Sequence, residues 1–138
     1  MNQYMVDWKG RLVLRKLSFV GHSLGGIIIR EAIEHLAEFT EFFHGYVSLG
    51  SPHLGFLYNS STLIDAGMWL LKSWTQSACL KQLSMTDAHS FSDTFLFKLS
   101  QKKSLDNFKH IILVGSFQDR YAPCDSTRIQ ICSQALES

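Results

Sequence analysis

The chain has 138 residues, 46% of them hydrophobic, and a formal net charge of +1 at pH 7. That length allows one domain with a packed core, and the near-neutral charge excludes the basic surface that nucleic acid requires. The apolar runs are too short to span a bilayer, and no motif indicates a metal ion or a cofactor. The cysteines fit no metal or redox motif, which indicates reduced thiols and a cytoplasmic protein. They are Cys79, Cys124 and Cys132.

The apolar pattern predicts strands that alternate with helices, which is typical of a parallel α/β sheet. Residues 2–8 are predicted as the end of a helix that Gly10 closes. Three strands are recognisable, and a helix follows the first of them from Leu24 to about Phe39. A last helix is expected from near Asp125, with apolar positions at Ile129, Ile131, Cys132 and Leu136. The three predicted strands are 17–20, 46–49 and 110–114.

Residues 56–107 interrupt this alternation and are predicted as a helical insert that resembles a lid. A capping box at Thr62 to Asp65 begins one helix, and weaker helices are expected over 79–83 and 94–100. Apolar side chains of the first helix line an acyl pocket in one interpretation. In the other they cap the core of the sheet, which their helical spacing favours. These side chains are Trp69, Leu70 and Trp74.

A G-x-S-x-G pentapeptide, residues 21–25, lies between the first strand and its helix. This order of strand, turn and helix is what a nucleophile elbow requires. Ser23 is the predicted nucleophile, and the N–H of Leu24 is the predicted oxyanion donor, aided by the positive end of the helix. We expect Gly21 and Gly25 where the two backbones pass too close for side chains.

A serine nucleophile needs a base that takes its proton and an acid that orients the base. In α/β-hydrolases the acid follows a later strand, and Asp119 stands just past residues 110–114. A competing interpretation makes Asp119 a loop residue, paired with Arg120 or closing an Asx turn. Asp125 is the other candidate acid, although its position at a predicted helix N-cap explains it without catalysis.

The base is the open question, because no histidine follows Asp119 in the sequence. His53 comes after the second strand and could reach the site, but it would break the usual order of serine, acid and histidine. His89 lies in the insert and could arrive only if the insert closed. We therefore expect the catalytic histidine beyond residue 138. The predicted substrate contacts are His22, His53 and Leu54.

Several stretches together resemble the serine-esterase domain of the lipase-like α/β-hydrolases, in particular the C-terminal domain of large intracellular lipase-like proteins. The resemblance covers nearly the whole chain. The matching stretches are LSFVGHSLG (17–25), SPHLG (51–55), LYNSS (57–61), FLFKLS (95–100) and VGSFQDRY (114–121).

The resemblance implies an α/β-hydrolase fold, Ser23 as nucleophile, Asp119 as acid and a role in lipid metabolism through hydrolysis of lipid acyl esters. It also implies earlier strands with a second oxyanion donor, and a later strand that precedes the catalytic histidine. Because none of these is recognisable in residues 1–138, we expect a single incomplete domain. Alone it would be inactive and would expose the edge of the elbow strand. The alternatives are a catalytically inactive module that binds lipid or protein, and a thioesterase.

Overall fold

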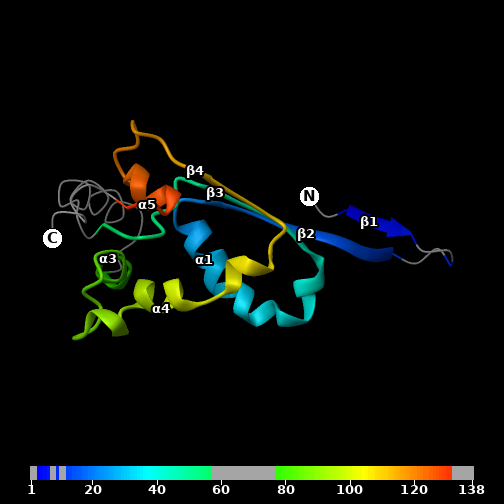
Figure 1. The fold of residues 1–138 in the computed structure, drawn as a ribbon, viewed down its shortest axis with the longest axis horizontal. Helices are drawn as coiled ribbons and strands as arrows, with labels where there is room; N and C mark the ends of the chain where they lie inside the picture. The colour runs from blue at the N-terminus through cyan, green and yellow to red at the C-terminus, as the bar shows by residue number, and fades with distance from the viewer. Residues whose placement is uncertain (1–2, 7–8, 10–11, 57–76, 132–138) are drawn as a thin grey trace.

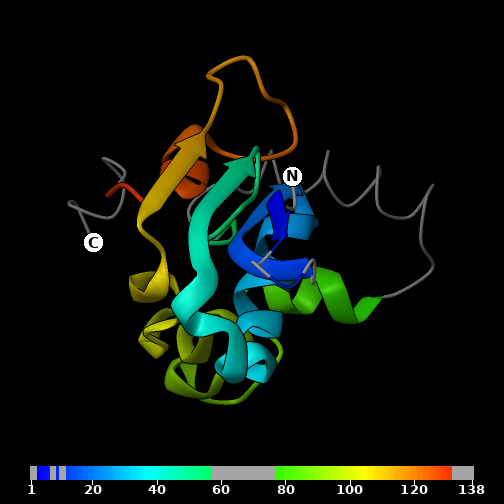
Figure 2. The ribbon, with the colours of Figure 1, turned by 90° about the vertical axis from the view of Figure 1, so that its right-hand side faces the viewer.

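The computed structural model describes residues 3–6, 9, 12–56 and 77–131. Its strands form one sheet in the order β1-β2-β3-β4. Strand β1 is antiparallel to β2, whereas β2, β3 and β4 are parallel and lie side by side (Figure 1 and Figure 2). The strands are β1 (Gln3–Val6), β2 (Leu12–His22), β3 (Phe43–Leu49) and β4 (His110–Val114).

Helices follow the parallel strands, so the predicted α/β arrangement with three parallel strands is confirmed. Helices α1, η1 and α4 lie on one side of the sheet in Figure 1, and α5 lies near the carboxyl end of β4. The α-helices are α1 (Leu24–Ala32), α3 (Ser77–Leu83), α4 (Phe95–Gln101) and α5 (Cys124–Arg128). The 3₁₀ helices are η1 (Ile33–Phe42), η2 (Phe91–Asp93) and η3 (Ser104–Asn107).

The amino end of the chain differs from the prediction, because residues 3–6 form strand β1 rather than the end of a helix. Tyr4 pairs with Leu14 and Val6 with Leu12, in a hairpin that extends away from the helices (Figure 1). Tyrosine and valine favour strands, and the pairing satisfies their backbone groups. The expected exposed edge of the elbow strand is therefore covered over its first part. Within the described residues, its second part, 17–22, pairs with β3 alone.

Two predicted helices are shorter than expected. Helix α1 ends at Ala32 and continues as η1, in which Leu36 has non-helical φ and ψ angles of −114° and 28°. Helix α5 has 5 residues and ends where Ile129 takes a left-handed φ of 54°, so Ile129 and Ile131 are exposed rather than packed. Cys132, Leu136 and the helix predicted from Thr62, with its tryptophans, lie outside the described residues.

Two apolar clusters hold α1 in place. Phe43 and Phe108 stack with ring centroids 4.9 Å apart, and Phe19 meets both edge-on, which packs η1 and η3 against the sheet. The second cluster joins α1 to α3 and α4 beneath the carboxyl end of the strands. Its buried members are Ile27, Phe56, Leu83, Leu96 and Leu99. Among the described residues, no helix has the length and apolar character needed to cross a membrane.

Candidate active site

The turn between β2 and α1 consists of one residue, Ser23. Its φ and ψ are 54° and −127°, a backbone conformation that is costly for any residue with a Cβ atom. The Ser23 N–H donates to the carbonyl of Leu49 at 2.9 Å, and the Ser23 carbonyl accepts from Gly26 N–H at 3.3 Å. The strained serine is thus held from both sides, by β3 and by the first turn of α1.

Two positions around this turn, Gly21 and Gly26, have no room for a side chain, and only Gly21 was predicted to be crowded. A Cβ at Gly21 would lie 2.5 Å from Gly26 N, so the close approach expected there is confirmed. A Cβ at Gly25 would meet nothing within 4 Å, and that expectation is wrong. Successive residues project from different sides of a helix, so Gly25 faces outward and Gly26 faces β3. A Cβ at Gly26 would lie 2.7 Å from Ser48 Oγ and would also strike Ser51 Oγ.

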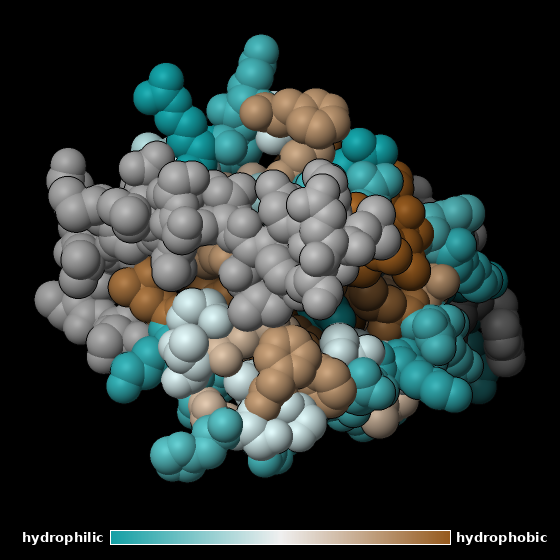
Figure 3. Space-filling view, turned by 60° about the vertical axis from the view of Figure 1, so that its left-hand side comes forward, coloured by the Kyte–Doolittle hydropathy of each residue, from teal (hydrophilic) through white to brown (hydrophobic). Residues whose placement is uncertain are grey.

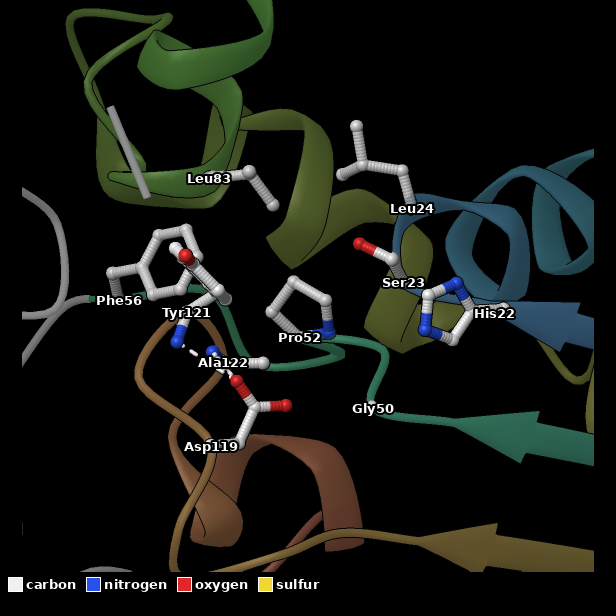
Figure 4. Close-up of a pocket in the computed structure, with 10 residues that line it drawn as sticks. All are labelled: His22, Ser23, Leu24, Gly50, Pro52, Phe56, Leu83, Asp119, Tyr121 and Ala122. Carbon is white, nitrogen blue, oxygen red and sulfur yellow. Dashed lines mark hydrogen bonds between the residues drawn. The ribbon is translucent and has the colours of Figure 1, made fainter. Parts of the chain in front are cut away.

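A cleft of ≈ 290 Å³ opens above Ser23, at the carboxyl end of the parallel strands. The Ser23 hydroxyl points into it, and Asp119 lies on the opposite wall (Figure 4). Figure 3 shows this end of the molecule, where hydrophobic surface lies next to hydrophilic side chains. Most of the wall is apolar, which suits the apolar part of a ligand. The cleft is lined by His22, Ser23, Leu24, Gly50, Pro52, Phe56, Leu83, Asp119, Tyr121 and Ala122.

The Asp119 carboxylate is fixed on one oxygen. Its Oδ1 accepts from the backbone N–H groups of Tyr121 at 2.8 Å and Ala122 at 3.1 Å (Figure 4). This is the Asx-type turn of the competing interpretation, and it leaves Oδ2 without a hydrogen bond to any described residue. Asp125 does not line the cleft, because it lies in the first turn of α5. It follows the first helical residue and is therefore not the N-cap that was expected.

Leu24 and His22 flank Ser23 and both line the cleft. Leu24 is the first residue of α1, so its N–H has no acceptor within the helix and lies at the positive end of the helix dipole. The ring of the exposed His22 lies beside Ser23, but the Ser23 hydroxyl points away from it (Figure 4). His22 is therefore not placed to take the hydroxyl proton in this arrangement.

His53 and Leu54, expected at the substrate, lie outside the cleft lining. Residues 51–55 form a tight turn, closed by His53 N–H on the Ser51 carbonyl and by Gly55 N–H on the Pro52 carbonyl. The turn directs the His53 ring inward, where it is 2% exposed. Burial is the main cause that lowers the pKa of His53 to about 4, and the positive charge of Arg30 adds to it.

No described histidine therefore lies between Ser23 and Asp119. His89, the candidate from the insert, is exposed and does not line the cleft. The described residues also contain no group of three or more His, Cys, Asp or Glu side chains that could hold a metal ion. The cleft thus brings together the predicted nucleophile, oxyanion donor and acid, with a space between them.

Comparison with known families decides the wider assignment. The model of the family described as "Putative serine esterase (DUF676)" matches residues 3–134. The chain belongs to the DUF676 family. This membership confirms the resemblance to serine esterases that the sequence motifs carry, and it supports hydrolase chemistry at a serine. No solved structure matches the chain.

Proposed function

We propose that this DUF676 domain is a serine hydrolase of carboxylic esters, with Ser23 as nucleophile. The observation that supports it best is that one cleft joins the strained Ser23 to Asp119, whose Oδ2 is unoccupied by any described donor. Backbone strain at a serine that lines a cleft is typical of a functional site rather than of a purely structural turn. The triad acid also needs one oxygen fixed and one free to accept from a histidine.

In the proposed reaction, Ser23 Oγ attacks the carbonyl carbon of the ester while its proton passes to a base. The tetrahedral oxyanion accepts a hydrogen bond from Leu24 N–H, and the alcohol leaves after it takes the proton back from the base. Water then hydrolyses the acyl-serine by the same steps in reverse order. The base in this reaction is a histidine whose Nδ1–H donates to Asp119 Oδ2, a position that no described histidine occupies.

The lining of the cleft supports a lipid acyl ester as the substrate, and hence a role in lipid metabolism. Pro52, Phe56, Leu83 and Ala122 offer apolar surface to an acyl chain, and no lysine or arginine is among the lining residues described. A cytoplasmic setting belongs to the same proposal, because Cys79 and Cys124 are free thiols.

One observation favours a second candidate, a catalytically inactive module that binds lipid or protein. It is that no described imidazole lies between Ser23 and Asp119. The two candidates are separated by adding free imidazole, which can occupy that space and act as the missing base. We expect a fluorophosphonate probe to label the chain faster when imidazole is present, and Ser23→Ala to abolish labelling.

Asp119→Asn tests the acid in the same assay, with Asp125→Asn as the matched control. The loss of Asp119 should reduce the effect of imidazole by about a hundredfold or more, because the bound ring loses its orienting charge. Asp125→Asn should behave like the unmodified chain. Labelling that survives Ser23→Ala would exclude this nucleophile. Absence of labelling both with imidazole and in the chain extended by its downstream coding sequence would favour the inactive module.

A further inference from the structure

A chain of buried polar side chains runs behind the cleft, from α1 through β3 and back to α1. Arg30 Nη1 lies 3.4 Å from His53 Nδ1, and His53 Nε2 lies 2.8 Å from Ser48 Oγ. The Ser48 hydroxyl also lies near Tyr46, whose own hydroxyl donates to the Gly26 carbonyl at 2.9 Å. These four side chains, Arg30, His53, Ser48 and Tyr46, are each at most 6% exposed, and we call them the buried polar chain.

The direction of every hydrogen bond in the buried polar chain follows from its first member. A guanidinium can only donate, so His53 Nδ1 must be the acceptor and the ring proton must be on Nε2. Nε2–H then donates to Ser48 Oγ, and the Tyr46 hydroxyl donates to the Gly26 carbonyl. His53 is neutral at pH 7, as this order requires, because its pKa is about 4.

The two ends of the buried polar chain lie one turn apart on α1, at Gly26 and Arg30. The first turn of the helix is therefore tied to β3 by side chains as well as by packing. Gly26 also donates its N–H to the Ser23 carbonyl, and its open face lies against Ser48 Oγ and Ser51 Oγ. The residue that receives the last hydrogen bond thus holds the strained serine directly.

A strained backbone conformation persists only where its surroundings determine it. The buried polar chain supplies such surroundings on the helix side of Ser23, and the Leu49 carbonyl supplies them on the strand side. We propose that the buried polar chain is a positioning device, which holds Ser23 in its reactive conformation. The inference rests on the function proposed above, and it adds residues that touch neither the substrate nor the reacting atoms.

Tyr46→Phe tests the device with little change in packing, because it removes the donor to Gly26 and keeps the ring. The matched control is Ser104→Ala, since Ser104 is also buried and its Oγ has no partner among the described residues. We expect Tyr46→Phe to slow the imidazole-supported labelling of Ser23 on the order of tenfold to a hundredfold. The loss should fall in the limiting labelling rate, with the half-saturating probe concentration unchanged, and Ser104→Ala should label normally.

His53 gives a conservative rescue in the same assay. His53→Gln keeps an acceptor for Arg30 and a donor for Ser48, whereas His53→Leu keeps neither. We expect the leucine variant to lose labelling rate and the glutamine variant to recover most of it. Equal rates in folded Tyr46→Phe, His53→Leu and Ser104→Ala proteins would overturn the inference while leaving the proposed function intact.

Nuclear magnetic resonance provides a readout that needs no activity. The imidazole nitrogen shifts of His53 should show the Nε2–H form, and the backbone shifts of Ser23 should report its left-handed φ. Tyr46→Phe should move the Ser23 shifts toward ordinary values, and Ser104→Ala should leave them unchanged. Unchanged Ser23 shifts in Tyr46→Phe, or an Nδ1–H form of His53, would overturn the inference even if the wild-type chain never reacts with the probe.

Discussion

Replacement of His53 by glutamine should make the fold less sensitive to acid. Burial and the charge of Arg30 lower the pKa of His53 from 6.5 to about 4. Between these two pH values His53 is protonated in the unfolded chain and neutral in the folded chain. The contribution of His53 to stability is therefore fully present above about pH 6.5 and is lost as the pH falls toward about 4. Below about pH 4 this group causes no further change in stability.

The magnitude follows from the two pKa values. Their difference is 6.5 minus about 4, or about 2.5 units, and each unit corresponds to about 1.36 kcal/mol, which gives a loss of roughly 3 kcal/mol. The free energy of unfolding of a small domain is about 5–15 kcal/mol, so the loss is large enough to measure. His44 contributes with the same sign, because burial and its cationic neighbours lower its pKa, but it titrates equally in both proteins and cancels.

The assay is urea unfolding of the wild type and of His53→Gln at pH 7 and near pH 4. The drop in free energy of unfolding between the two pH values should be smaller in His53→Gln by about 3 kcal/mol. His89→Gln, which changes an exposed histidine, should retain the wild-type drop. If His53→Gln and the wild type lost the same stability on acidification, His53 would not be buried in its neutral form, and the order of donors argued above would fail.

Two further predictions concern backbone geometry. Gly26→Ala should destabilise the fold by about 1–3 kcal/mol, because its Cβ would meet Ser48 Oγ, whereas Gly25→Ala should be neutral or stabilising by up to about 1 kcal/mol. Equal urea midpoints for the two variants would contradict this assignment of the crowded glycine. Ile129→Asn should stabilise by about 1 kcal/mol, because asparagine tolerates the left-handed φ at this exposed position. A lower thermal midpoint would refute it.

Features that depend on local sequence were predicted well. Strand β4 has the predicted bounds, 110–114, because a short apolar run between polar segments identifies a strand by itself. The order of strand, turn and helix around Ser23 is likewise a local pattern. Strand β1 was missed, since its identity depends on a hairpin partner and not on its own four residues.

The buried polar chain was missed because hydropathy misassigns one face of α1. Arg30 follows three isoleucines, and its charge favours the exposed face of the helix, yet it is 6% exposed while Ile28 is 64% exposed. Helical spacing does indicate the buried face, because Ile27, Arg30 and Ile33 are three residues apart and share it. His53 lies against Arg30 on that buried face. Its ring points inward because residues 51–55 fold into a tight turn.

The positions of two energetically unfavourable features, the buried Arg30 and the strained Ser23, are evidence for function. An arginine buried without an ion pair to any described carboxylate costs desolvation, which lowers the pKa of Arg30. A leucine at that position would extend the apolar face of α1 at no such cost, and a glycine at position 23 would relieve the strain of the turn. Both features lie within about two helical turns of the serine that lines the cleft. A fold selected for stability alone has no reason to place them together, whereas a hydrolase that must hold one hydroxyl in a strained position does.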